Sequence, residues 1–308
     1  MWLKKLKKGS WLVVAMISTM IILQSCLKND DGDYYDAYGI LAEDIIKIEE
    51  YLQNNNIDAE MDSSTGVFYQ IHRQGEGYKT IQGVEVEVHY QGLTLDGNEF
   101  VNTFGAGPKT ITLGNPDSYP PTVTGGVTIG LSLMKEGDSA TVYTPSPYGF
   151  QDKYYQGVPA NSILVYNIKF EDVKNLSEDY EKIDQYIIDK NMMVEIEPEY
   201  GMRYVIHREG NNISPEPGAA ISTHYQLELL DGSIIQSSFD TGITFDLVYG
   251  KGDVIPGFEM GLSQLHENDS ATIFVPSIYG YKDVAQNEIP ANSVLIFILD
   301  ITRISNPL

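Results

Sequence analysis

The side chains of this chain that could act on another molecule are aromatic and apolar. In the C-terminal half they stand at the ends of expected strands and in the loops between them, where a cleft could use them. Two of the set are tyrosines, and a half-buried phenol can donate a hydrogen bond to a ligand carbonyl. The pattern indicates an apolar pocket with a phenol at its rim. The competing interpretation is plain hydrophobic core. The set is Tyr225, Phe245, Ile255, Phe258, Tyr279 and Phe297.

No group of polar residues in the sequence suggests an alternative active site. The five histidines include two pairs that recur along the chain, His72 with His207 and His89 with His224, which we interpret as structural residues rather than metal ligands. The Gly-Gly pair at 125–126 is not followed by the Lys-Ser/Thr of a phosphate-binding loop. We therefore expect neither a metal nor a cofactor.

The charge of the chain argues against one class of partner. Twenty Lys and Arg residues stand against 43 Asp and Glu, which gives a formal net charge of -23. Such a negative field repels phosphate backbones, so we expect no nucleic acid partner.

Residues 1–25 have the composition of a secretory signal peptide. Lysines near the start precede the apolar run Trp11–Leu23, which is shorter than the roughly 20 residues of a spanning helix. Cys26, the single cysteine, follows a small residue at the expected cleavage point and resembles the lipidated cysteine of bacterial lipoproteins. Gln24 departs from the usual lipoprotein pattern. The alternative is an uncleaved anchor with a buried or free thiol.

The lipoprotein interpretation predicts where the protein resides. Lipid on Cys26 would anchor the mature chain to a bacterial outer membrane, on its periplasmic or its outer surface. Residues 26–40 are charged and acidic, and we expect them to be a tether between the lipid and the folded part.

The rest of the chain is an internal duplication. A shift of 135 residues aligns His89-Tyr90-Gln91 with His224-Tyr225-Gln226, and a shift of 131 later aligns Pro159–Ser162 with Pro290–Ser293. The repeat predicts an N-terminal copy, residues 41–174, and a C-terminal copy, residues 175–308. Each copy should begin with an amphipathic helix, because apolar residues recur at helical spacing at Leu41, Ile45, Ile48 and Leu52 and at Leu176, Tyr180, Ile183 and Ile187.

The segments after each helix alternate like strands. Val84, Val86, Val88 and Tyr90 should share one core-facing side, and Ala271, Ile273 and Val275 should do the same in the second copy. Several strands with one or two short helices predict an α+β fold for each copy.

Separated motifs in the C-terminal copy resemble one known family. Residues 219–302, and more weakly 84–173, resemble the FK506-binding-protein (FKBP) type peptidyl-prolyl cis-trans isomerases. The resemblance implies two tandem domains, each a half-open antiparallel sheet wrapped around a short helix. The motifs are His224-Tyr225, Leu230-Asp231-Gly232, Val254–Leu262, Val275-Pro276, Tyr279-Gly280 and Ile289–Ser293.

The resemblance also implies a binding pocket. Phe258 takes the floor position where the family usually has tryptophan, and Gln236 stands where the family commonly has an aspartate. The backbone N–H of Ile255 and the phenol of Tyr279 would hold substrate carbonyls. The implied pocket residues are Tyr225, Ile235, Phe245, Val254, Ile255, Phe258, Tyr279, Ile289 and Phe297.

The N-terminal copy departs further from the family. It keeps counterparts of three aromatic positions in Tyr90, Phe100 and Tyr148, but Val127 replaces the floor aromatic and Val101 the aspartate. We expect its cleft to be shallow or refilled, and this copy to be inactive.

Two functions remain open from the sequence. The first is an exported prolyl isomerase that assists folding of proline-containing polypeptide clients through its C-terminal copy. The second is a lipoprotein that binds extended peptide as a chaperone or assembly factor, with weak catalysis or none. The missing carboxylate at Gln236 favours the second, and the aromatic set favours the first.

Overall fold

The computed structural model describes residues 36–114 and 120–307. Its N-terminal part is one seven-stranded antiparallel sheet in the order β1-β2-β6-β7-β3-β4, with β5 paired to β3. The elements are α2 (Ala37–Asn54), β1 (Glu60–Met61), β2 (Phe68–Arg73), β3 (Glu85–Thr94), β4 (Glu99–Asn102), β5 (Lys109–Thr112), α3 (Gly125–Leu133), β6 (Ser139–Thr144), the 3-10 helix η2 (Ser146–Tyr148) and β7 (Leu164–Val173).

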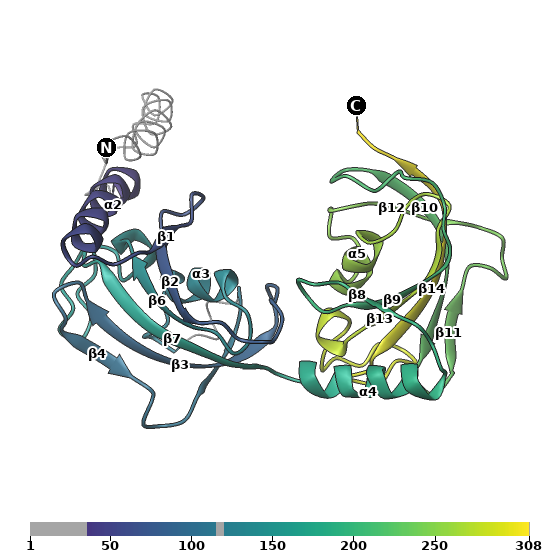
Figure 1. Ribbon diagram of the computed structural model, residues 1–308, viewed down its shortest axis with the longest axis horizontal. Helices are drawn as coiled ribbons and strands as arrows, with labels where there is room; N and C mark the ends of the chain where they lie inside the picture. The colour runs from purple at the N-terminus through teal and green to yellow at the C-terminus, as the bar shows by residue number, and fades with distance from the viewer. Residues whose placement is uncertain (1–35, 115–119, 308) are drawn as a thin grey trace, which may run out of the picture.

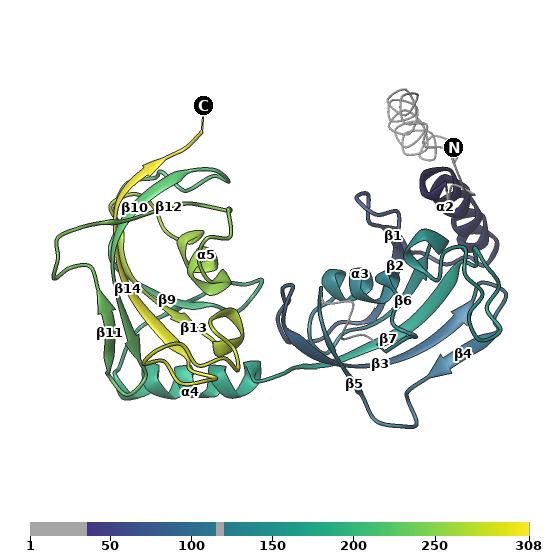
Figure 2. The ribbon, with the colours of Figure 1, turned by 180° about the vertical axis from the view of Figure 1, so that it is seen from behind.

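The C-terminal part repeats this arrangement element for element. Its sheet has the order β8-β9-β13-β14-β10-β11, with β12 paired to β10, so the α+β fold of two tandem domains is confirmed. Figures 1 and 2 show each sheet curved around its own short helix, α3 or α5. The elements are α4 (Leu176–Asp189), β8 (Glu195–Ile196), β9 (Arg203–Arg208), β10 (Ala220–Leu229), β11 (Ile234–Ser237), β12 (Phe245–Val248), α5 (Pro256–Leu262), β13 (Ser270–Val275), the 3-10 helix η3 (Ser277–Tyr279) and β14 (Leu295–Ser305).

The predicted helices and core faces are present. All four apolar positions predicted on α4 are buried, and on α2 three are buried while Leu41 packs partly buried against the others. The alternating face of β3 is also confirmed, since Val84, Val86, Val88 and Tyr90 are each no more than 1% exposed.

Glycines let the short helices lie directly on the sheets. Gly257 and Gly261 are one helical turn apart on α5, so they share a face. A Cβ at Gly257 would come within 2.2 Å of Val275 Cγ1, and one at Gly261 within 2.3 Å of Ile273 Cδ1. Any larger residue would push α5 off β13 and lift the ring of Phe258 with it.

Strand β13 is buried on both faces, although the sequence pattern predicted burial of one face only. Ala271, Ile273 and Val275 are buried as predicted, but Thr272 and Phe274 on the other face are buried too. The reason is that α4 covers this second face, where the Tyr186 ring lies 6.0 Å from that of Phe274.

A buried carboxylate ties each long helix to the turn after a central strand. Asp179 on α4 accepts hydrogen bonds from the Ser277 backbone N–H at 2.7 Å and from its hydroxyl at 2.5 Å. Asp44 on α2 makes the same pair of bonds to Ser146, at 2.8 and 2.6 Å. Because buried polar groups need partners, each carboxylate fixes the helix to the turn at one point.

Parts of the export prediction lie outside the described residues, namely the signal segment 1–25, Cys26 and residues 26–35 of the expected tether. The last tether residues, 37–40, instead form the first turn of α2, so the folded part begins earlier than predicted. Among the helices that the structure does describe, none is both long and apolar enough to cross a membrane.

We predict that Asp179→Ala lowers the free energy of unfolding by about 3 kcal/mol, because it removes two charge-assisted hydrogen bonds and leaves a buried N–H without a partner. Thermal unfolding of the full chain measures the effect. Glu178→Ala is the matched control: it removes the same charge from the preceding, exposed position, and should change stability by less than about 0.5 kcal/mol. Equal destabilisation by both variants would contradict this role for Asp179.

Candidate functional site

Four of the predicted aromatic residues meet on the concave side of the C-terminal sheet. Phe258 from α5 lies edge-on to Phe297 of β14, with ring centroids 5.0 Å apart. Tyr225 from β10 contacts Phe245 of β12 at 5.5 Å and also approaches the rings of Phe258 and Phe297, both at 6.4 Å. Phe258 and Phe297 are buried, whereas Tyr225 and Phe245 are partly exposed. The cluster therefore presents an apolar surface with an open side.

The N-terminus of α5 brings a backbone donor to this cluster. Ile255 is the N-cap of α5 in an extended conformation, and Pro256 begins the helix. The side chains of Val254 and Ile255 pack partly buried against the core, while Ile289 is buried. Among the residues that the structure describes, none accepts a hydrogen bond from the Ile255 N–H. This donor is free to bind a ligand.

Tyr279 does not lie at the rim of the cluster, contrary to the sequence prediction. It is fully buried, and its hydroxyl donates to the backbone carbonyl oxygen of Lys79 in the N-terminal copy at 3.3 Å. Burial is the main cause that raises the pKa of its phenol, followed by nearby Tyr200 and Glu136. The 3-10 helix η3 turns the chain after β13, and the Tyr279 phenol is engaged by the N-terminal copy rather than exposed at the cluster.

Tyr281 is a phenol near Tyr225 that the sequence analysis did not name. It packs partly buried against the same core, and its phenol is close enough to Tyr225 to raise the pKa of Tyr225, second to the effect of burial. A usable signal was present in the repeat, because the counterpart of Tyr281 under the shift of 131 residues is Phe150, another aromatic residue.

Two further predicted positions on β11 differ in exposure. Ile235 is partly buried and packs against the core. Gln236 is exposed and lies opposite Leu227 in the register of β10 with β11. An exposed amide neither fills the pocket nor adds charge to it.

The N-terminal copy has a filled counterpart of this cluster. Tyr90 and Phe100 both contact Tyr166, at 6.4 and 5.9 Å, and Val127 is buried where Phe258 stands in the other copy. Tyr166 is fully buried, and burial raises the pKa of its phenol. The third predicted residue, Tyr148, is half-buried near Asp62, whose charge contributes to raising the pKa of Tyr148 after burial does.

Hydroxyl groups lock the filled cluster in place. The Tyr166 hydroxyl donates to the Thr122 carbonyl oxygen at 3.3 Å and accepts from the Thr124 hydroxyl at 3.1 Å. The Tyr90 hydroxyl lies 2.6 Å from the Thr122 hydroxyl. Among the described residues, Tyr166 stands at the repeat position of Phe297 and is held by two threonines, while Val127 leaves the first cluster without an aromatic residue at the floor position.

The sequence profile described as FKBP-type peptidyl-prolyl cis-trans isomerase matches residues 77–171 and again residues 211–302, together more than half of the chain. The chain belongs to this family. Within it, peptidyl-prolyl cis-trans isomerase FKBP9 of Mus musculus is 24% identical over 218 residues, which cover 70% of this chain and 34% of that protein. The chain therefore spans about a third of the length of that relative.

Two further FKBP-type relatives are bacterial. The isomerase FkpA of Buchnera aphidicola is 34% identical over 115 residues, covering 37% of this chain and 43% of that protein. The crystal structure of FkpA from Escherichia coli is 22% identical over 42% of this chain and 59% of that chain, with a TM-score of 0.37.

The histidines of this FKBP-type chain have structural partners. His72 and His207 each lie within hydrogen-bond distance of a threonine hydroxyl on the neighbouring strand, at 2.7 and 2.8 Å. His89 and His224 each stack on an exposed phenylalanine, at 5.4 and 5.5 Å. Within residues 36–114 and 120–307, no three metal-ligating side chains come together.

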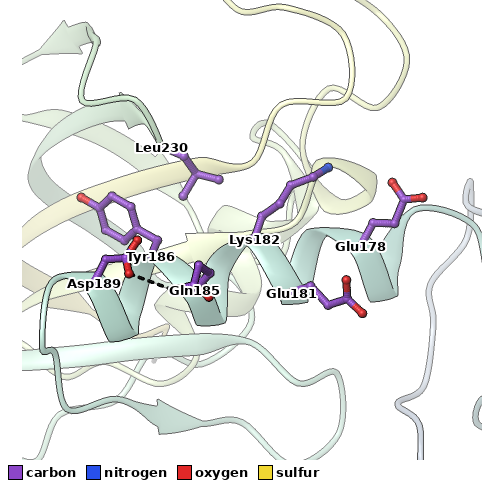
Figure 3. Close-up of a pocket in the computed structure, with 7 residues that line it drawn as sticks. All are labelled: Glu178, Glu181, Lys182, Gln185, Tyr186, Asp189 and Leu230. Carbon is purple, nitrogen blue, oxygen red and sulfur yellow. Dashed lines mark hydrogen bonds between the residues drawn. The ribbon is translucent and has the colours of Figure 1, made fainter.

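A separate hollow lies along α4, away from the aromatic cluster (Figure 3). It holds about 710 Å³, and Gln185 donates to Asp189 across one end of it at 2.7 Å. Charged side chains line most of this groove and remain hydrated, so it is less suited to an apolar ligand than the aromatic cluster is. The lining residues are Glu178, Glu181, Lys182, Gln185, Tyr186, Asp189 and Leu230.

One carboxyl group close to Tyr279 titrates near neutrality. Burial, and then the charge and hydrogen bonding of Asp172, raise the pKa of Glu136 to about 7. Below about pH 4.5 this carboxyl is protonated in both the folded and the unfolded chain. As the pH rises from there to about 7, only the unfolded chain ionises, so the free energy of unfolding falls, and the loss is complete above pH 7.

We predict that Glu136→Gln stabilises the chain at pH 8, by about 1–2 kcal/mol after allowance for solvent screening of a half-buried group. At pH 4 the native protein and the variant should melt at the same temperature, as thermal unfolding at the two pH values will show. Glu76→Gln removes an exposed carboxylate from the same region and should shift the melting temperature equally at both. A Glu136→Gln gain of the same size at pH 4 would rule out a raised pKa as its cause.

Proposed function

We propose that the C-terminal copy is a prolyl isomerase that acts on proline-containing segments of polypeptide clients. The observation that carries the proposal is the four-ring cluster built on Phe258, open on one side and bordered by the free N–H of Ile255. A proline ring is apolar and fits a desolvated aromatic surface, while the carbonyls beside it need donors. Family membership supports the same assignment.

The reaction requires no acid, base or metal. Rotation about an X–Pro bond meets a barrier of roughly 20 kcal/mol, because the planar amide has resonance that the twisted transition state lacks. An apolar surface stabilises the twisted amide relative to the more polar planar one. The Ile255 N–H and the phenol of Tyr281 would hold the substrate carbonyls while the bond turns. Tyr281 takes the role that the sequence had assigned to Tyr279, because the latter phenol is bonded elsewhere.

A second candidate is peptide binding with weak catalysis or none. The exposed Gln236, in place of a carboxylate beside the pocket, favours it. The same surface would then retain extended chains as a chaperone does, without accelerating their isomerisation.

The site of action follows from the N-terminal segment. The signal-like residues 1–25 and Cys26 support export and lipid anchoring at a bacterial outer membrane, with clients among exported proteins. We regard the membrane contact as one made through the lipid alone.

We predict that Phe258→Ala lowers kcat/KM on a proline tetrapeptide by about a hundredfold, since loss of a buried aromatic floor costs about 3 kcal/mol or more. Tyr281→Phe removes one hydrogen bond and should cost less than about tenfold. The assay follows cis-to-trans isomerisation with the full chain. Phe100→Ala, in the filled N-terminal cluster, is the matched control and should leave the rate unchanged. A native protein that binds the peptide without accelerating its isomerisation would favour the second candidate.

We predict that Cys26→Ala abolishes incorporation of radiolabelled fatty acid and leaves the chain uncleaved or soluble, because Cys26 is the single cysteine available for acylation. Labelling of the native protein and the variant in a bacterial host tests this. Label that persists in the variant would exclude Cys26 as the lipid site.

A further inference from the structure

The connection between β2 and β3 of the N-terminal copy lies on the C-terminal copy. The ring of Tyr78 in this connection lies edge-on to that of Tyr180, with centroids 5.6 Å apart, and the Arg203 guanidinium is 5.9 Å from the Tyr78 ring. Gly201 makes room for this contact, because a Cβ there would come within 2.5 Å of Tyr78. We call residues 77–83 the bridging loop.

Lys79 extends the contact through its backbone as well as its side chain. Its N–H donates to the Glu199 carbonyl oxygen at 2.9 Å, and its ammonium group pairs with the Glu199 carboxylate, also at 2.9 Å. Its carbonyl oxygen accepts the hydrogen bond from the buried hydroxyl of Tyr279. Both the main chain and the side chain of the loop are thus engaged by the C-terminal copy.

A second bond from the C-terminal copy reaches the far end of the bridging loop. The ammonium group of Lys282 donates to the carbonyl oxygen of Gly83. Tyr281 therefore lies in sequence between two residues, Tyr279 and Lys282, that both bond to the loop. Lys282 has a φ of 58° and its counterpart Gln151 a φ of 60°, so both copies make this turn, and the bonds to the loop are what distinguish the C-terminal one.

At the equivalent turn of the N-terminal copy, the described residues provide no such support. Among the described residues none accepts a hydrogen bond from the Tyr148 phenol, the counterpart of Tyr279. Gln151, the counterpart of Lys282, bonds back to Pro147 within its own turn, at 3.3 Å. The support is specific to the copy whose aromatic cluster is open.

We propose that the bridging loop of the N-terminal copy holds Tyr281 in place for the C-terminal pocket, with Tyr78, Lys79 and Gly83 as positioning residues. The inference rests on the proposed isomerase function. It gives the copy with the filled cleft a role in the chemistry of the other copy, although no bridging-loop residue touches substrate.

The first test measures the loop contact without any activity. Tyr78→Ala in the full chain should increase amide hydrogen exchange of residues 279–284 by about tenfold or more, because the turn loses its outside support. The N–H groups that report it include Lys282, bonded to Ser277, and Val284, bonded to Tyr281. Tyr78→Phe keeps the ring and should restore native exchange. Tyr154→Ala, at an exposed position of the same copy, is the control and should change nothing in 279–284. Unchanged exchange in Tyr78→Ala overturns the proposal.

The second test measures catalysis. A turn that holds Tyr281 correctly for only part of the time lowers the apparent affinity in proportion, and saturating substrate restores the competent state. Tyr78→Ala should therefore raise KM by about threefold, less than the loss expected on removing the Tyr281 hydroxyl itself, with kcat changed less than about twofold. Faster exchange with native KM would show that the loop does not position the pocket. An inactive native protein would refute the isomerase function instead, and the exchange result alone would then decide whether the loop holds the turn.

Discussion

The buried carboxylate of Asp179 is the interaction on which the C-terminal site depends. It joins α4 to the first residue of η3, and η3 sets the direction in which the chain leaves β13. The chain turns out of β13 at Ser277, and the bonds to Asp179 hold the start of the turn that carries Tyr279 and Tyr281. The same device in the N-terminal copy, with Asp44 and Ser146, gives the same turn there.

Much of the fold could be predicted from the sequence, because each element carries its own periodicity. The buried face of α4 follows from apolar residues three to four apart, and that of β3 from apolar residues two apart. Once the elements of the C-terminal copy form, the rings of four aromatic residues meet, namely Tyr225, Phe245, Phe258 and Phe297. The position of Tyr279 could not be predicted in this way. Period-two alternation stops at Pro276, and the direction beyond it depends on a carboxylate almost 100 residues earlier.

Contacts between distant segments could not be predicted either, because local periodicity carries no information about them. Burial of Phe274 comes from α4, not from the pattern of β13, and the bond between Lys79 and Tyr279 joins residues 200 positions apart. In the N-terminal cleft, one feature could be predicted from the sequence and another could not. The loss of an aromatic floor at Val127 could be predicted from the repeat, but the hydrogen bonds that hold Tyr166 could not, because they depend on two threonines that face that ring.

The bridging loop and the turn that it contacts belong to one polypeptide. Two separate proteins joined by so few bonds would part when diluted, whereas segments of a single chain meet at an effective concentration set by the connection between them. Here that connection is short, since β7 ends at Val173 and α4 begins at Leu176. The contact is therefore independent of how many copies of the protein a cell makes.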